Sequence, residues 1–475
     1  MRITRLERSV WELEPEGDMR VPGRLYASED MLEQIQHDPA LRQLSNVAHL
    51  PGVFLRCMAM PDIHYGYGFP IGGVAATTMD EGVISPGGVG YDINCGVRMI
   101  RTCLKAQDIQ GILPRLMDFL FFSVPSGIGS KGDIRLDRNQ LLKVLEEGID
   151  WAVKEGYAWD EDPIFTEDMG RMEGADTATV SERALDRGRE QLGTLGSGNH
   201  FLEIQRVDNV FDAKTAECLG IELDQIVLMI HSGSRGFGYQ VCDDALKSMR
   251  SRKEVLKLPD KQLCCAPHGS NEGKRYWSSM ACAANYGWVN RQILTYRVRK
   301  AFEEFFKEPS HALGLYLVYD VAHNIAKRET HIVQGQSYTL CVHRKGATRA
   351  FGPGRQELPD AYRPLGQPVL IPGSMGSASY LLLGTMLAME ETFGSTAHGA
   401  GRRLSRKAAM DACRGRSIPK EMQSLGVFVR AQGKQTLAEE IPEAYKDVDG
   451  IVDVLEQCGL SRRIARMMPL GCVKG

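Results

Sequence analysis

Short aliphatic runs that end in glycine-rich turns recur along this chain of 475 residues and constrain its fold more than any other feature. Runs such as residues 226–230, 315–319 and 368–371 predict buried strands. Glycine supplies 50 residues, more than a tenth of the chain against an average usage of about 7%. No repeat or Pro/Ser-rich linker divides the sequence. We therefore expect one large domain over residues 1–475, of mixed α/β class, with central β-sheets surrounded by helices.

Amphipathic segments between these runs predict helices. Residues 137–154 place Leu141, Leu145 and Ile149 on one face, and Asp137 is a candidate N-cap. We also expect helices at 239–257, 286–307 and 380–392, with helical insertions around 239–310. Strands and helices do not alternate regularly, and no G-x-G-x-x-G sequence opens a helix, so the pattern argues against a Rossmann fold.

Charge and cysteine usage exclude several classes of protein. The N-terminus lacks the apolar stretch of a signal peptide, and the longest nearly apolar run, 380–389, is well short of the ~18–20 residues of a membrane span. None of the 12 cysteines stands in C-x-x-C spacing, and many free thiols favour a reducing compartment. We therefore expect a cytoplasmic protein with no membrane partner. The net charge of −3 argues against a histone-like coat, although basic clusters occur at 247–261 and 402–416.

Three histidines and one cysteine stand where predicted strands meet glycine- or asparagine-containing turns. The histidines are His200, His231 and His323, and a fourth turn carries Asp92 and Cys95 three residues apart. Imidazole, thiolate and carboxylate are ligands of divalent transition metals, and strand ends let distant parts of a chain converge. Any one of these histidines alone is more often a satisfied core or loop residue, and the repetition of the pattern at four sites is what favours a metal site. Ligand chemistry favours zinc first and manganese second, and spacing does not decide between one ion and two.

A further histidine, His398, lies between glycines in a turn that continues into Arg402 and Arg403. Flanking glycines let a phosphate approach the imidazole, and backbone N–H groups and arginines can hold its charge, which suits a nucleophile that attacks phosphorus. The loop at 372–379 is also suited to phosphate or nucleobase contact, and neither sequence matches a P-loop. The Lys446-Asp-Val-Asp449-Gly450 sequence is one residue too long for a nucleotidyl-transferase K-x-D-G motif and predicts a surface turn.

Taken together, nine blocks of the chain closely resemble the tRNA-splicing ligase RtcB family. They follow in order over nearly the whole sequence: 61–73, 90–98, 198–203, 231–236, 322–324, 343–347, 372–379, 398–402 and 473–475. The resemblance implies a compact α/β fold of its own type, in agreement with the missing strand–helix alternation.

The resemblance also implies a set of ligands and their residues. Cys95 would bridge two manganese ions, with Asp92 and His200 completing one site and His231 and His323 the other. GTP would be the second cofactor, and His398 would take GMP covalently. The residues that would line the guanosine nucleotide are Asn199, His200, Phe201, Leu202, Glu203, His323, Asn324, Pro372, Gly373, Ser374, Met375, Ser379, His398, Gly399, Ala400, Gly401 and Lys474.

The implied enzyme is a GTP-dependent RNA ligase that joins a 3′-phosphate or 2′,3′-cyclic phosphate end to a 5′-hydroxyl end through a guanylylated RNA 3′ end. Arg98, Arg235, Arg344 and Lys345, with the basic clusters, would guide the RNA backbone. An archease-type activator is an expected partner. A dinuclear metal-dependent phosphodiesterase would use the same cysteine and histidines without needing His398 or GTP, and it is the alternative.

Overall fold

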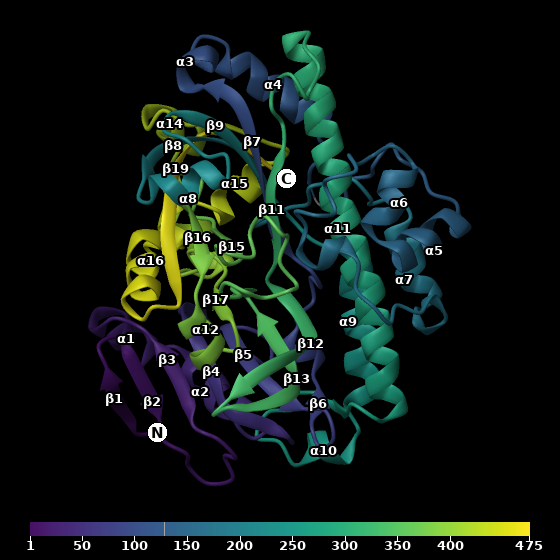
Figure 1. Ribbon diagram of the computed structural model, residues 1–475, viewed down its shortest axis with the longest axis vertical. Helices are drawn as coiled ribbons and strands as arrows, with labels where there is room; N and C mark the ends of the chain where they lie inside the picture. The colour runs from purple at the N-terminus through teal and green to yellow at the C-terminus, as the bar shows by residue number, and fades with distance from the viewer. Residues whose placement is uncertain (128) are drawn as a thin grey trace.

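The computed structural model describes residues 1–127 and 129–475, and most of its strands belong to two large sheets (Figure 1). The first sheet contains the N-terminal strands and a long hairpin from the middle of the chain, and it has the order β1-β2-β3-β4-β5-β13-β12. Its strands are β1 (Ile3–Glu7), β2 (Val10–Leu13), β3 (Gly23–Tyr26), β4 (Val53–His64), β5 (Ile71–Thr78), β12 (Asn324–Val333) and β13 (Gln336–Lys345).

The second sheet has the order β11-β7-β9-β8-β19-β16-β15, and β18 pairs in parallel with β19. Its strands are β7 (Gly96–Lys105), β8 (Phe201–Val210), β9 (Gln225–Ser232), β11 (Leu317–Ala322), β15 (Pro368–Ile371), β16 (Ser379–Gly384), β18 (Phe428–Ala431) and β19 (Ser461–Lys474). Two small sheets pair β6 (Val83–Ile84) with β10 (Ala266–Pro267) and β14 (Ala347–Arg349) with β17 (Ser395–Ala397). The chain passes from the second sheet to the first at His323, between β11 and β12.

Helices pack around the sheets, and the long helix α11 runs along one side of the molecule next to α9 (Figure 1). The helices are α1 (Glu29–Ile35), α2 (Pro39–Val47), α3 (Ala106–Ile109), α4 (Leu113–Ser123), α5 (Arg138–Glu147), α6 (Ile149–Lys154), α7 (Glu182–Gly188), α8 (Ala213–Cys218), α9 (Arg235–Met249), α10 (Lys253–Leu256), α11 (Asn271–Phe306), α12 (Met386–Glu391), α13 (Arg406–Ala412), α14 (Ile418–Ser424), α15 (Lys434–Glu439) and α16 (Val448–Gln457). Short 3₁₀ turns occur at Pro86–Gly88, Glu167–Gly170, Thr177–Thr179 and Pro442–Ala444. The mixed α/β class with sheets surrounded by helices is thus confirmed.

Several predicted elements are present with changed ends. The three predicted strands correspond to β9, β11 and β15. The helix expected at 137–154 begins behind Asp137, whose side chain accepts from the Gln140 N–H as predicted, but it divides into α5 and α6. Gly148 separates them with φ of 60°, a conformation that a right-handed helix does not contain. The helix expected at 239–257 begins earlier and breaks after Met249, and the one expected at 286–307 is the second half of α11.

One predicted helix is wrong. Residues 380–392 form strand β16 followed by the short helix α12, with Thr385 as the N-cap whose hydroxyl accepts from the Ala388 N–H. β16 pairs with β15 and β19, and its alternating side chains are buried in two different cores, Leu381 and Leu383 in one and Tyr380 and Leu382 in the other. A short apolar run cannot be assigned to strand or helix by periodicity alone. Here, backbone pairing with β15 and β19 makes the first part of the run a strand.

A buried charge network lies beneath the second sheet. Asp320 on β11 accepts from Arg98 Nε at 2.8 Å and from Arg291 on α11 through Nε at 2.8 Å and Nη2 at 2.7 Å, and all three side chains are fully buried. Arg344 is also fully buried and pairs with Glu329 at 2.6 Å. The expectation that Arg98 and Arg344 guide RNA is therefore wrong, because neither reaches the surface. Their charges serve the interior of the protein.

Within the described residues, every cysteine is a free thiol. None of the helices in this part of the chain combines the length and apolar character needed to cross a membrane.

Replacement of Asp320 by asparagine tests the energetic role of this network. Asp320→Asn keeps the shape of the side chain but leaves two buried guanidinium groups without their carboxylate. We expect the free energy of unfolding to fall by about 3–5 kcal/mol, measured by urea denaturation. The control is Glu182→Gln, which breaks the exposed Arg138–Glu182 pair and should leave the urea midpoint unchanged. Equal midpoints for Asp320→Asn and the unmodified protein would contradict this role.

Candidate metal and nucleotide site

The largest concentration of predicted site residues lies in a cavity of about 400 Å³ where the two large sheets meet. From the first sheet, His64, Ile71, Asn324 and Lys345 line it. From the second sheet, Phe201, Glu203, His231 and Lys474 line it. The loop that carries His398 closes another wall. The cavity is thus assembled from segments throughout the chain.

Strand register brings the metal-ligand candidates together. In the second sheet, His231 on β9 is paired with Val97 on β7 and with Phe201 on β8. This places it beside the turns that carry Cys95 and His200. His323 follows β11, and its backbone N–H donates to the Cys95 carbonyl at 2.9 Å. Hydrogen bonds between backbones therefore hold these side chains at one end of the sheet.

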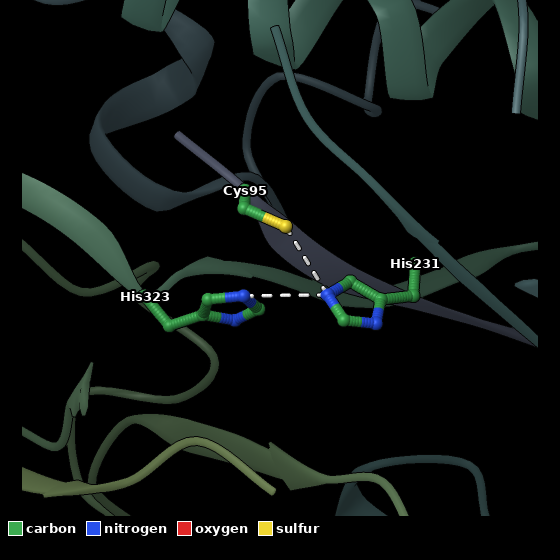
Figure 2. Close-up of side chains that lie close together, drawn as sticks. All are labelled: Cys95, His231 and His323. Atoms are coloured by element: carbon green, nitrogen blue, oxygen red, sulfur yellow. Dashed lines mark hydrogen bonds between the residues drawn. The ribbon is translucent and has the colours of Figure 1, made fainter. Parts of the chain in front are cut away.

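Cys95 belongs to two groups of side chains that could each hold a metal ion. Its Sγ lies 3.2 Å from His231 Nε2, which is 3.3 Å from His323 Nε2 (Figure 2). The same Sγ lies 3.4 Å from His200 Nε2, which is 2.9 Å from an Asp92 oxygen. The structure therefore brings together all five predicted ligands, with the thiol common to both groups.

The hydrogen bonds around these groups fit a cation better than a proton network. His200 Nδ1 lies 3.0 Å from the Leu195 carbonyl, which can only accept, so Nδ1 carries a proton and Nε2 is the ring nitrogen directed toward Asp92 and Cys95 that could hold an ion. The other Asp92 oxygen is buried and has no partner among the described residues. A divalent ion would satisfy these converging lone pairs.

Burial shifts the pKa values of this cluster. The shifts of the two histidines favour metal binding, whereas the shift of the cysteine opposes it. Burial, followed by neighbouring positive charges, holds the pKa of His231 and His323 well below the usual value, so both imidazoles are neutral ligands near pH 7. Burial and then the adjacent Asp92 raise the pKa of the Cys95 thiol well above its usual value. A bound cation would reverse this last shift by stabilising the thiolate.

His398 lies beside the cluster, with its ring centroid 4.9 Å from that of His323. Its Nδ1 is 2.6 Å from an oxygen of the fully buried Asp62, and the same oxygen accepts from the His398 backbone N–H at 2.9 Å. The carboxylate therefore keeps the proton on Nδ1 and leaves Nε2 as the free, nucleophilic nitrogen. Gly401, with φ of 67°, permits this contact, since a Cβ there would overlap the Asp62 carbonyl.

Most of the predicted nucleotide residues line the cavity. These are Asn199, Phe201, Glu203, His323, Asn324, Pro372, Gly373, Met375, His398, Gly399, Ala400, Gly401 and Lys474. His200 does not line the cavity itself but contacts Asp92 and Cys95, which do. Three others are placed differently: the Leu202 side chain packs in a hydrophobic core with α4 and α11 residues, Ser374 bonds within its own loop, and the buried Ser379 hydroxyl joins Gln205 to the Gly373 N–H.

Glu203 and Lys345 are buried ionisable groups in the cavity wall. Burial raises the pKa of Glu203 to about 7, although hydrogen bonding to Gln205 and the charge of Lys474 oppose the shift. Burial lowers the pKa of Lys345 to about 7, and its Nζ donates to the Phe69 carbonyl at 3.2 Å. Both groups can therefore change charge near neutral pH.

Two residues that support His398 were missed in the sequence. Asp62 stands in the block at 61–73, but nothing local marks it as the partner of a histidine 336 positions away. Lys446, expected in a surface turn, instead reaches inward, where its Nζ donates to the Ile63 carbonyl and, at 3.3 Å, to that of Pro61. Its backbone N–H also donates to the Gly401 carbonyl at 3.0 Å. Lys446 therefore joins the segments that carry Asp62 and His398.

The basic clusters are largely neutralised by nearby carboxylates. In the cluster at 402–416, Arg402, Arg414 and Arg416 pair with Glu440, Asp411 and Glu421. Arg402 and Arg406 nevertheless line the cavity. Most of this cluster is thus a solvated surface, with two members at the site.

The profile of a family described as tRNA-splicing ligase RtcB matches residues 43–475 of this chain. The chain belongs to the tRNA-splicing ligase RtcB family. It is 52% identical to the tRNA-splicing ligase RtcB of Methanococcus maripaludis, covering 96% of this chain and 95% of the relative. The relatives of the same name from Archaeoglobus fulgidus and Thermococcus kodakarensis are also 52% identical, covering 98% and 100% of this chain and 97% and 99% of theirs. The resemblance that the motifs indicated is confirmed, and the protein is an enzyme of the RNA ligase class.

Cys95 belongs to both groups of candidate ligands in this RtcB family member, which predicts how its loss changes metal content. With Mn²⁺ as the probe ion, we expect Cys95→Ala to weaken metal binding at both candidate groups by more than the 10–100-fold that loss of an outer-shell partner causes. His323→Ala should weaken one group and leave the Asp92 group able to bind. Titration followed by electron paramagnetic resonance would measure the stoichiometry. Cys341→Ala removes a buried thiol on β13 and is the control. Unchanged stoichiometry in Cys95→Ala would contradict the shared ligand.

Proposed function

We propose that this RtcB family member joins RNA 3′-phosphate or 2′,3′-cyclic phosphate ends to 5′-hydroxyl ends, using GTP and two Mn²⁺ ions. The observation that carries the proposal is the position of His398, which is oriented by Asp62 and lies next to the Cys95 cluster in one cavity. A nucleophilic imidazole beside a set of metal ligands suits transfer of a phosphorus-containing group.

In the first step, His398 Nε2 attacks the α-phosphorus of GTP. The Nε2–P bond forms as the bond from phosphorus to the pyrophosphate oxygen breaks, and pyrophosphate leaves with that electron pair. Asp62 accepts the Nδ1 proton in a hydrogen bond throughout and stabilises the positive charge that develops on the ring. No general base is needed, because a neutral imidazole already has a lone pair.

In the later steps, an oxygen of the RNA 3′-phosphate takes GMP from Nε2, which regains its lone pair. The 5′-hydroxyl oxygen then attacks the phosphorus of this activated RNA end and gives its proton to solvent. The bond from that phosphorus to the GMP oxygen breaks, and GMP leaves with the electron pair as the new phosphodiester forms. A 2′,3′-cyclic phosphate must first be opened by water. Each transfer depends on holding the reacting atoms in line within the cavity.

The chain supplies distinct residues for the two ligands. Asp92, Cys95, His200, His231 and His323 would hold the metal ions, which neutralise phosphate oxygens and orient attacking groups when bound. In its ionised form, Glu203 would accept hydrogen bonds from the N–H groups of guanine. Lys474, whose Nζ is 3.2 Å from the Gly198 carbonyl, would contact a polar part of the nucleotide. An archease-type activator and a transfer RNA substrate also belong to this proposal.

Labelling with GTP tests the covalent intermediate. Incubation of the protein with Mn²⁺ and GTP radiolabelled at the α-phosphate should leave acid-labile label on the protein, detected after denaturing electrophoresis. His398→Ala should abolish the label, whereas His311→Ala, remote from the cavity, should keep it. Phosphodiester cleavage without any label would favour the dinuclear phosphodiesterase instead.

The contact between Asp62 and His398 also predicts how fast the label forms. Asp62→Asn keeps the side-chain shape but removes the negative charge that stabilises the ring as Nε2 attacks. We expect the rate of His398 labelling to fall by about 10²–10³-fold, as for loss of one preorganised electrostatic contact. Rapid-quench measurement of label formation gives the rate, and circular dichroism checks the fold. A labelling rate within twofold of the unmodified protein would overturn the assigned role of Asp62.

A further inference from the structure

A row of three tyrosine rings leads from the cavity to the protein surface. Tyr67 and Tyr91 line the cavity. The Tyr91 ring stacks on Tyr239, with centroids 4.8 Å apart and 23° between the planes, and Tyr67 meets Tyr91 edge-on at 5.6 Å. Tyr239, in the first turns of α9, is 47% exposed. The row is therefore continuous from the reaction site to solvent.

The inner end of the row adjoins the reacting groups. Tyr91 directly precedes Asp92, whose carboxylate contacts His200 at 2.9 Å. Tyr67 accepts at its backbone carbonyl from Lys345, another residue of the cavity wall. Any chain that follows the tyrosine row inward thus ends within the cavity that holds His398.

Arginines flank the row at both ends. The Arg187 guanidinium of α7 lies over the Tyr239 ring, 5.6 Å from its centroid, and Arg250 lies beside the Tyr67 hydroxyl. Lys247 and Arg252, near Arg250 in sequence, pair with Asp243 and Glu272. Neither Arg187 nor Arg250 has such a carboxylate partner in the part of the chain that the structure describes. Their charges remain available to a negatively charged ligand.

Aromatic rings interleaved with arginines are the combination that proteins use for single-stranded nucleic acid. Bases stack on the rings, and the arginines contact the phosphates. A base-paired end cannot offer its base faces to protein side chains in this way, because they are already stacked in the duplex.

We infer that Tyr67, Tyr91 and Tyr239, with Arg187 and Arg250, form a subsite that binds the unpaired nucleotides next to the RNA end being joined. This rests on the proposed function, because it assumes that an RNA end enters the cavity. The same chemistry would recognise either the 3′-phosphate strand or the 5′-hydroxyl strand. The subsite makes the enzyme selective for ends whose terminal nucleotides are unpaired.

Tyr239 provides the test because it is the most exposed ring and lies outside the Cys95 cluster. We expect Tyr239→Leu to raise the KM for ligation of RNA with unpaired ends by about fivefold or more, at the lower end of what stacking of one base predicts. Tyr239→Phe keeps the ring and should remain within twofold of the unmodified protein. Labelling of His398 by GTP, which needs no RNA, should proceed at the same rate in all three proteins.

Abasic nucleotides then show whether the lost interaction is with a base. In the unmodified protein, abasic sites next to the joined end of the contacted strand should raise the KM by a factor similar to that of Tyr239→Leu, and the variant should show no further rise. Placing the abasic sites in one strand at a time identifies which strand is bound. Two results would overturn the subsite. One is that Tyr239→Leu and the abasic nucleotides raise the KM independently, so that their factors multiply whichever strand carries the abasic sites; the other is an unchanged KM in Tyr239→Leu. Absence of label in the unmodified protein would instead overturn the proposed function.

Discussion

The guanidinium group of Arg291 is the constraint on which the rest of the site depends. From α11, it donates to Asp320 on β11, to the Asn94 carbonyl at 2.6 Å and to the Ser232 carbonyl at 3.0 Å. Asn94 and Ser232 are the neighbours of Cys95 and His231 in sequence, and Asp320 lies three residues before His323. One buried side chain thus joins the three segments that carry the shared cluster. Such an arrangement is stable only because Asp320 balances the charge, and Asp320 also pairs with Arg98.

The meeting of the two sheets gives the site its chemistry. The second sheet and its adjoining turns contribute the metal-ligand candidates. Strand β4 of the first sheet contributes Asp62, and the loop after β17 contributes His398. Because the chain crosses from one sheet to the other at His323, that residue is next to both Cys95 and His398. The proposed nucleophile, held by a buried carboxylate, and the cluster of candidate metal ligands therefore face a single cavity. Family membership alone does not explain why His398 and the Cys95 cluster lie next to each other; the arrangement of the two sheets does.

Much of the site could be predicted because its residue types are unusual in their local setting. The sequence alone shows three histidines where an apolar run meets a glycine- or asparagine-containing turn, and a cysteine three residues after an aspartate. Asp62 and Lys446 could not be found in this way, because their roles arise from contacts more than 300 positions away in sequence. The burial of Arg98 and Arg344 was missed because sheet pairing and packing enclose them: Arg98 pairs with Asp320, 222 positions away, and Arg344 pairs with Glu329 on the neighbouring strand β12. The metal, the nucleotide contacts and the single-domain organisation remain predictions.

The sequence by itself determined the chemical repertoire: the ligand types, the glycines that allow close approach to His398, the strand propensity of the aliphatic runs, and the motifs that mark the family. Only the tertiary structure decided which of these groups meet, which charges are buried, and that residues 380–384 form a strand. The physical reason is that propensity acts over a few residues, whereas sheet register and the pairing of buried charges set distances between segments far apart in the chain. Those long-range contacts placed Cys95, already expected as a shared ligand, within reach of both groups, and they made Tyr239 the outer end of an aromatic row.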